Sequence, residues 1–219
     1  MTGRPRGRPP SPRLNRAMVV AAAVELVRRD GLDSLTVRGL ADRLDVRPAA
    51  VYHHLGGLDA VRGAVCEAVL STIAVPAAGT AWRTWLRDLA TKVRTVLLEH
   101  PGTSGWFRVQ GAYAERQLDI VNQAMDVLLG AGFTAAEAAL GYSVLLAFTL
   151  DVVELEDERR RAGPSPARQV WAERLARSGP VPLAPGLTSA LTLFLATTPD
   201  DLFNHGLALI LDGMDRRRG

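Results

Sequence analysis

The sequence predicts an all-α protein with a small N-terminal head of three helices and a larger C-terminal helical body. Three observations lead to this fold class. Apolar residues recur three and four positions apart along most of the chain. Gly- and Pro-containing breaks separate these stretches. Aromatic residues are only 5% of the 219 residues while Ala and Leu abound, which favours helices over strands.

Three helices are expected in the head, over about 12–29, 34–44 and 47–55. Ser11 is a suitable N-cap for the first helix, and Gly31 ends it. Pro48 suits the first turn of the third helix. The body is expected to hold helices over about 58–73, 82–99, 114–129, 134–160 and 199–217, the last capped by Thr198, with short helical segments around Trp106 and Trp171.

The charge of the chain is unevenly distributed. The net charge is +3, but residues 1–62 contain 11 Arg against 6 acidic residues, whereas the remainder contains 15 basic and 17 acidic residues. A basic head on a weakly acidic body suits a polyanionic partner at one end, although an uneven soluble surface would give the same count.

The single cysteine, Cys66, excludes a disulfide framework and indicates a reducing compartment. No apolar secretory signal opens the chain, and the apolar run 138–150 is too short for a bilayer of roughly 30 Å. We therefore expect a cytoplasmic protein with no membrane partner.

The strongest local signal is the pair of short helices within 36–55, which a tight turn joins. The second helix carries little apolar bulk, as expected for a helix that enters the major groove in a helix-turn-helix motif. Ala49 and Ala50 would allow a close approach to bases, and Tyr52, His53 and His54 supply hydrogen-bonding groups. A plain helical hairpin with partly buried Tyr and His is the alternative.

The stretch TVRGLADRLDVRPAAVYHHLGGLDAV, residues 36–61, resembles the DNA-binding segment of the TetR family of transcriptional regulators. WRTWLRDLA, FTLDVVELED and DDLFNHGLALILDGM, at 82–90, 148–157 and 200–214, resemble the tetracycline-repressor branch in order and spacing. The resemblance covers nearly the whole chain after the first 12 residues. It implies a helix-turn-helix DNA-binding domain at 13–62 and a ligand-binding and dimerisation domain at 63–219.

The resemblance also implies roles for matched head residues. Thr36, Arg38 and His54 fall at phosphate contacts, and Leu58 replaces a phosphate-binding Lys that the family often carries. The recognition helix would present Arg47, Pro48, Ala49, Ala50 and Tyr52.

The first 12 residues form a basic arm rich in Pro, Gly and Arg, which we expect to be disordered. The segment 5–9 resembles the core of an AT-hook, so Arg6 and Arg8 would lie in an A/T-rich minor groove. A merely solubilising arm is the alternative.

Dimerisation is expected on the helix 134–160 and the last helix. The first is apolar nearly all round over 138–150, so it should be covered on opposite sides. The resemblance implies a four-helix bundle with the same helices of a second copy; covering a monomer core is the alternative. The expected interface residues are Leu145, Thr149, Val152, Phe203, Leu207, Ile210 and Met214.

The ligand pocket is placed by the resemblance, since each of its residues taken alone fits a core position equally well. In tetracycline repressors an Asn on the fifth helix and a Mg-binding His in the sixth hold the drug. The matched positions here are Leu89 and Trp106, which favours a larger, more apolar compound over Mg–tetracycline. The expected pocket residues are Trp85, Leu89, Trp106, Phe107, Gln110, Tyr113, Tyr142 and Trp171.

These observations predict a homodimeric repressor that binds a palindromic double-stranded DNA operator and leaves it when a small hydrophobic effector binds. No cofactor, metal site or catalytic pair is expected. Glu154, Glu156, Asp157 and Glu158 are better explained as a solvated helix end than as metal ligands. The alternatives are a regulator that senses a protein partner or oxidation at Cys66, and a ligand-binding protein or enzyme with a vestigial head.

Overall fold

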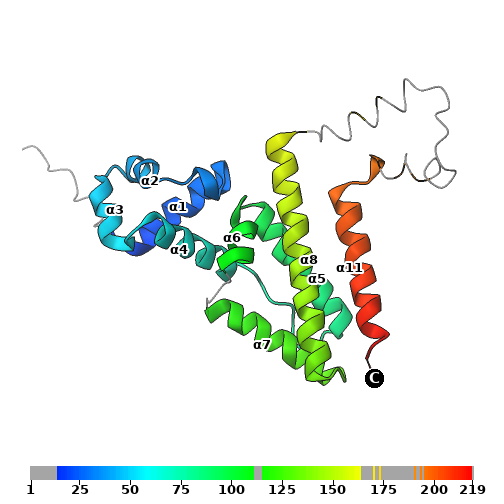
Figure 1. The fold of residues 1–219 in the computed structure, drawn as a ribbon. Helices are drawn as coiled ribbons and strands as arrows, with labels where there is room; N and C mark the ends of the chain where they lie inside the picture. Colours follow the sequence, from blue (N-terminus) through cyan, green and yellow to red (C-terminus); the bar gives the residue numbers. More distant parts are fainter. Residues whose placement is uncertain are drawn as a thin grey trace, which may run out of the picture.

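A computed structural model describes residues 14–110, 115–163 and 195–218, together with residues 170, 173, 190 and 193. Within this part the fold is all-α and no strand is present, as predicted (Figure 1). The helices are α1 (Arg16–Asp30), α2 (Val37–Leu44), α3 (Pro48–Leu55), α4 (Leu58–Ser71), α5 (Trp82–Leu98), α6 (Thr103–Gln110), α7 (Glu115–Gly130), α8 (Ala135–Ala162) and α11 (Pro199–Asp215), with a 3-10 turn, η1 (Leu32–Ser34), after α1. The predicted basic arm, Tyr113 and Trp171 lie outside the described residues, as does the side chain of Gln110.

Local capping explains where several helices begin. Thr134 and Thr198 each form a reciprocal capping box, with Glu137 and Asp201 respectively, which confirms the predicted cap of the last helix. The predicted start of the first helix at Ser11 is wrong. Its N-cap is Asn15, whose side chain accepts a hydrogen bond from the Met18 amide at 2.9 Å.

The head packs around a small apolar core between α1, α2, α3 and α4. Val19, Ala23 and Val27 of α1 meet Leu40 of α2 and Val51 of α3 there, and all five are buried. The predicted second helix began at residue 34, but 32–34 form the 3-10 turn. Helix α2 begins only at Val37, because the Thr36 side chain caps it.

Helix α8 is the centre of the body and packs against α5, α6, α7 and α11. Figure 1 shows α8 and α11 side by side, with the head at one end of the molecule. By length and composition alone α8 could cross a membrane. In this fold its neighbours are the other helices of the body, so it acts as a core helix.

Most of the predicted dimer residues are already buried inside one chain. Except for Ile210, which is half-buried, they are buried within the protomer. The reason is the close packing of α8 on α11. Gly206 lies against the ring of Phe148, where a Cβ would clash, and Gly141 lies against the end of Met214, which would have to move to admit a Cβ. These side chains therefore hold α8 and α11 together within the protomer.

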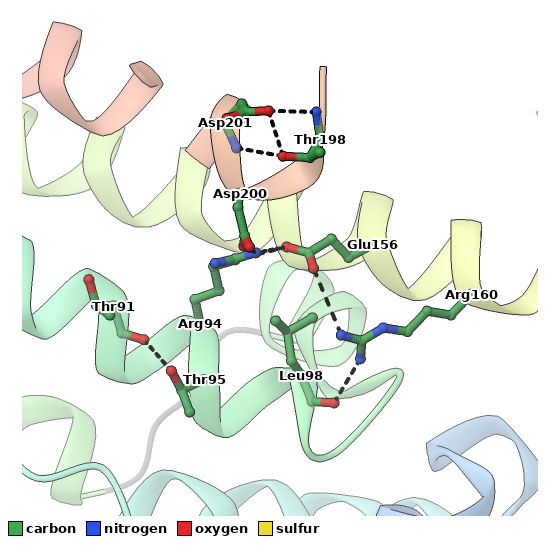
Figure 2. A network of polar contacts seen from close by, with 9 residues as sticks. All are labelled: Thr91, Arg94, Thr95, Leu98, Glu156, Arg160, Thr198, Asp200 and Asp201. Atoms are coloured by element: carbon green, nitrogen blue, oxygen red, sulfur yellow. Dashed lines mark hydrogen bonds and ion pairs between the residues drawn. The ribbon is translucent and has the colours of Figure 1, made fainter. Parts of the chain in front are cut away.

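A partly buried ion-pair network joins α5, α8 and α11 (Figure 2). The Arg94 guanidinium lies 2.6 Å from Glu156 and also pairs with Asp200. The same group lies 4.8 Å from the centre of the Phe203 ring. Arg160 approaches the second oxygen of Glu156 at 3.9 Å and donates to the Leu98 carbonyl at 3.3 Å.

We expect Arg94→Leu to lower the free energy of unfolding by about 3 kcal/mol, because it leaves the Glu156 carboxylate buried with only the more distant Arg160. Urea titration followed by circular dichroism measures this. The matched control is Arg108→Leu, whose partner Asp151 is, like Arg108, more than half exposed, so its loss should cost less than about 1 kcal/mol. Equal losses in the two variants would contradict the assigned role of Arg94.

Candidate nucleic-acid interface and internal cavity

The turn between α2 and α3 is set by Asp45, whose φ of 54° lies in the left-handed region. Asp tolerates this conformation better than most residues. The turn is closed by the Val46 amide, which donates to the Ala41 carbonyl at 3.0 Å. Because Val51 and Leu55 of α3 are buried in the head, the opposite side of α3 faces solvent.

The outer side of α3 carries the predicted recognition residues. Arg47, Pro48, Ala49, Tyr52 and His53 are exposed, Tyr52 to 54%. Ala50 and His54 are half-buried. An exposed tyrosine of this kind presents both a hydroxyl and an apolar ring to a partner.

The predicted phosphate contacts on α2 are also accessible. Thr36 and Arg38 are exposed. The Thr36 hydroxyl oxygen accepts from the Gly39 amide at 3.0 Å, which leaves its hydrogen free to donate. Leu58, at the start of α4, packs half-buried against the core and brings no cation there. Arg6 and Arg8 lie outside the described residues.

Ion pairing separates the arginines of the head into two groups. Arg28, Arg29, Arg43 and Arg62 pair with carboxylates. In contrast, Arg38 and Arg47 make no ion pair with any residue that the structure describes. Their charge is therefore available to a polyanion.

The body contains two small neighbouring voids between α4, α5, α6, α7 and α8. The larger, about 70 Å³, is lined by Leu70, Ile73, Val93, Leu97, Phe107, Gln117, Ile120, Tyr142, Leu146 and Leu150. The smaller, about 20 Å³, is lined by Leu89, Ala90, Val93, Tyr142, Leu145, Leu146 and Thr149. Val93, Tyr142 and Leu146 line both, so these three side chains separate the two spaces.

Three of the predicted pocket residues line these voids, namely Phe107, Leu89 and Tyr142. Trp85 is buried and Trp106 is half-buried against the core, but neither lines them. Sequence reasoning missed the contributions of α4 and α7, among them Gln117 and Ile120. The voids are far smaller than the roughly 300–1,000 Å³ of a drug-sized site, so a larger ligand would have to displace the side chains between them.

A third hollow lies on the surface between α8 and α11 and measures about 280 Å³. Leu140, Val144 and Leu209 line it and are 68%, 54% and 56% exposed. Gly141 and Gly213 form part of its floor, and Glu137 and Arg217 also line it. It is the largest of the three spaces, and its wall is mainly apolar.

The turn between α5 and α6 connects the body to the head. The Leu32 amide of η1 donates to the Pro101 carbonyl at 2.8 Å. The Gly102 amide in turn donates to Asp157 of α8 at 2.9 Å. Arg161 of α8 lies 3.2 Å from Asp33, and this pair also spans the two parts. Helix α8 therefore positions the turn between α5 and α6, and this turn contacts the head.

Asp157 is a buried carboxylate at this connection. It is 1% exposed, and its Oδ1 atom has no hydrogen-bond partner among the described residues. Burial raises the pKa of its carboxyl above the ordinary value, although the Gly102 amide, Arg160 and Arg161 act in the opposite direction. Glu156 is buried as well, so the prediction of a solvated helix end is wrong for both residues.

No group of three metal-ligating side chains occurs among the described residues. The histidine next to α6 is His100, one of the four in the sequence. Its buried ring donates from Nδ1 to the Val96 carbonyl at 2.7 Å.

Cys66 is poorly suited to sense oxidation. Its side chain projects from α4 into the hydrophobic core, and burial raises the pKa of its thiol to about 12. Oxidation proceeds through an accessible thiolate, and this thiol is neither accessible nor ionised at neutral pH.

Comparison with known proteins agrees with this arrangement. Residues 19–61 match the family model of bacterial regulatory proteins, tetR family, and residues 75–218 match the tetracyclin repressor-like C-terminal domain. The chain is 35% identical over 210 residues to the class A tetracycline repressor protein from transposon 1721 of Escherichia coli. The aligned region covers 91% of this chain and 90% of that relative. The class C tetracycline repressor protein of E. coli is 30% identical over 216 residues, covering 94% and 93%.

The crystal structure of ActR from Streptomyces coelicolor in complex with actinorhodin has the same fold. Its TM-score is 0.82 at 22% identity, over 94% of this chain and 99% of that chain. With a basic helix-turn-helix face, a helical body and both family models matched in order, the chain belongs to the tetR family of transcriptional regulators, in its tetracycline-repressor-like branch.

Proposed function

We propose that this protein is a homodimeric repressor in the cytoplasm, whose α3 helices bind a palindromic operator and which a small, mainly apolar effector releases from DNA. The observation that carries the proposal is the hydrogen-bonded connection from Leu32 in the head to Pro101, two residues before the start of α6. Helix α6 brings Phe107 into the wall of the larger void, so this short helix and the turn before it connect the void to the head. No catalytic role is proposed.

In the complex, α3 lies in the major groove and α2 follows the backbone. Tyr52 and Arg47 then reach base edges, while Thr36 and Arg38 reach phosphates. Two-fold symmetry requires the two heads to sit about one turn of DNA apart, roughly 34–36 Å.

The dimer forms on the surface hollow between α8 and α11. Its rim residues Leu140, Val144 and Leu209 are exposed apolar side chains on neighbouring helices, and Gly141 and Gly213 allow a close approach. The same two helices of a second copy fill the hollow. Two of the predicted interface residues, Ile210 and Met214, also line this hollow.

Release follows from the position of α6. An effector that widens the voids displaces Phe107 and with it the start of α6, which α8 holds through two contacts. Asp157 accepts from Gly102, and Glu154 lies 3.4 Å from the Ser104 hydroxyl. A shifted turn carries Leu32 and the head with it. The effector then weakens operator binding by the ratio of its affinities for the two conformations.

Neither alternative explains these features as well. A sensor of oxidation needs a reactive thiol, and the only cysteine is buried and protonated. A carrier with a vestigial head has no use for exposed Arg38 and Arg47 that no described carboxylate pairs.

Arg47→Ala and Tyr52→Ala should each weaken binding to an operator, selected in vitro with the wild-type protein, by about 1–3 kcal/mol, because each removes a contact in the groove. Gel-shift titration measures the affinity. Arg29→Ala is the control, because Arg29 pairs with Asp30 at the far end of α1. The operator affinity of this variant should equal that of the wild-type protein. Unchanged binding by both test variants would show that α3 is not the recognition helix.

Val144→Asp should convert the dimer to a monomer, because a buried carboxylate without a partner is strongly unfavourable in an apolar interface. Light scattering after size-exclusion chromatography reports the mass. Leu118→Asp makes the same kind of change at a 59% exposed position on α7 and should leave the dimer intact. A dimeric Val144→Asp protein would place the interface elsewhere.

Gly102→Ala should weaken operator binding without any effector. The residue has φ of 84°, and a Cβ would lie 3.3 Å from the Leu32 Cβ and 3.4 Å from its backbone nitrogen. Leu32 must therefore give way by a few tenths of an ångström, and we expect the head to move with it. Gly132→Ala introduces similar strain, at φ of 94°, but has nothing within 4 Å. The two variants should lose similar stability by thermal unfolding, and only Gly102→Ala should lose operator affinity; an equal loss of affinity would refute the proposed coupling.

A further inference from the structure

The wall of the larger void contains one buried polar atom without a hydrogen-bond partner among the described residues. Gln117 of α7 lines the void, and its Oε1 atom is buried with no hydrogen-bond partner among the described residues. Buried acceptors in native proteins are nearly always paired, so an unpaired amide oxygen in a cavity wall calls for a function. Apart from Gln117 and Tyr142, the lining side chains are hydrocarbon.

The neighbouring residue anchors this end of α7 to the void. Arg116 donates from Nη2 to the carbonyl of Ile73 at 2.6 Å, and Ile73 itself lines the void. This bond ties the start of α7 to the chain that follows α4. The Arg116 side chain thus fixes the adjacent residue, Gln117, at the wall of the void.

The lining also excludes a charged ligand. None of the ten residues around the larger void is ionised at neutral pH, because burial raises the pKa of the Tyr142 hydroxyl to about 12. An ion brought into such a space would lose its hydration without gaining a counter-charge. The chemistry of the wall therefore suits a neutral molecule with an apolar body and one donor group.

We infer that Gln117 determines effector specificity, by accepting a hydrogen bond from a hydroxyl or N–H group on an otherwise apolar ring compound. Phe107, Ile120 and Leu146 contact the apolar part. The inference rests on the proposed effector site, and it adds the chemical class of the effector and the residue that selects it. A compound of the same shape without the donor leaves the amide oxygen unpaired and binds more weakly.

The first test uses matched probes that differ only by a methyl group in place of a hydroxyl. The pairs are p-cresol with p-xylene and 2-naphthol with 2-methylnaphthalene, titrated into the full-length dimer by calorimetry without DNA. Wild-type protein should prefer the hydroxyl member of each pair, and Gln117→Leu should reduce that preference by about tenfold. Gln123→Leu, at an exposed position on the same helix, should behave as wild type.

The second test needs no ligand. If the Gln117 oxygen is unpaired in the free protein, Gln117→Leu should raise the midpoint of thermal unfolding, because a buried unsatisfied acceptor is replaced by hydrocarbon. A lower midpoint would show that the amide is already paired and would overturn the inference. It would also be overturned if no probe bound, or if the preference for the hydroxyl member were the same in wild-type and Gln117→Leu protein. Failure of the proposed function is seen separately, as probe binding that leaves operator affinity unchanged.

Discussion

The structure depends on the need to cover helix α8 on every side. Its 28 residues carry apolar side chains around most of the helix, so no single neighbour can bury it. Within one chain α5, α6, α7 and α11 bury part of this surface. The remaining strip, with Leu140 and Val144, lies beside Leu209 of α11, and we propose that a second copy covers it. Monomer packing and dimerisation are thus consequences of one hydrophobic helix.

The charged end of the same helix performs a different task. Asp157 and Glu156 are carboxylates in a region of low dielectric, and each is stabilised by partners from another element. Asp157 has the Gly102 amide, and Glu156 has Arg94. Buried charges contribute little net stability, but removing a partner is costly, so they favour one arrangement of the elements over others. That property suits a protein whose function requires the head to hold one position relative to the body.

The interior of the body is incompletely packed. Two small voids, separated by Val93, Tyr142 and Leu146, leave side chains without full van der Waals contact. The Gln117 amide oxygen, which is buried without a hydrogen-bond partner among the described residues, adds a further cost. A sensor benefits from both, because a ligand that fills the space and pairs the amide recovers what the free protein lacks. Stability given up at a binding site is a common feature of functional proteins.

The sequence by itself determined the local structure. Spacing of apolar residues located the helices, the cap at Thr198 follows from short-range chemistry, and the exposed face of α3 follows from Val51 and Leu55 being four residues apart. Only the tertiary structure decided which side of α8 faces inward and what the apolar stripe of α11 packs against, since a helix that is apolar nearly all round, such as α8, has no periodic signal to orient it. For this reason Leu145 and Phe203 proved to be core, and Leu140 and Val144 surface. The burial of Asp157, the Leu32–Pro101 bond and the place of Gln117 depend on contacts between residues far apart in the chain, and no local pattern encodes those.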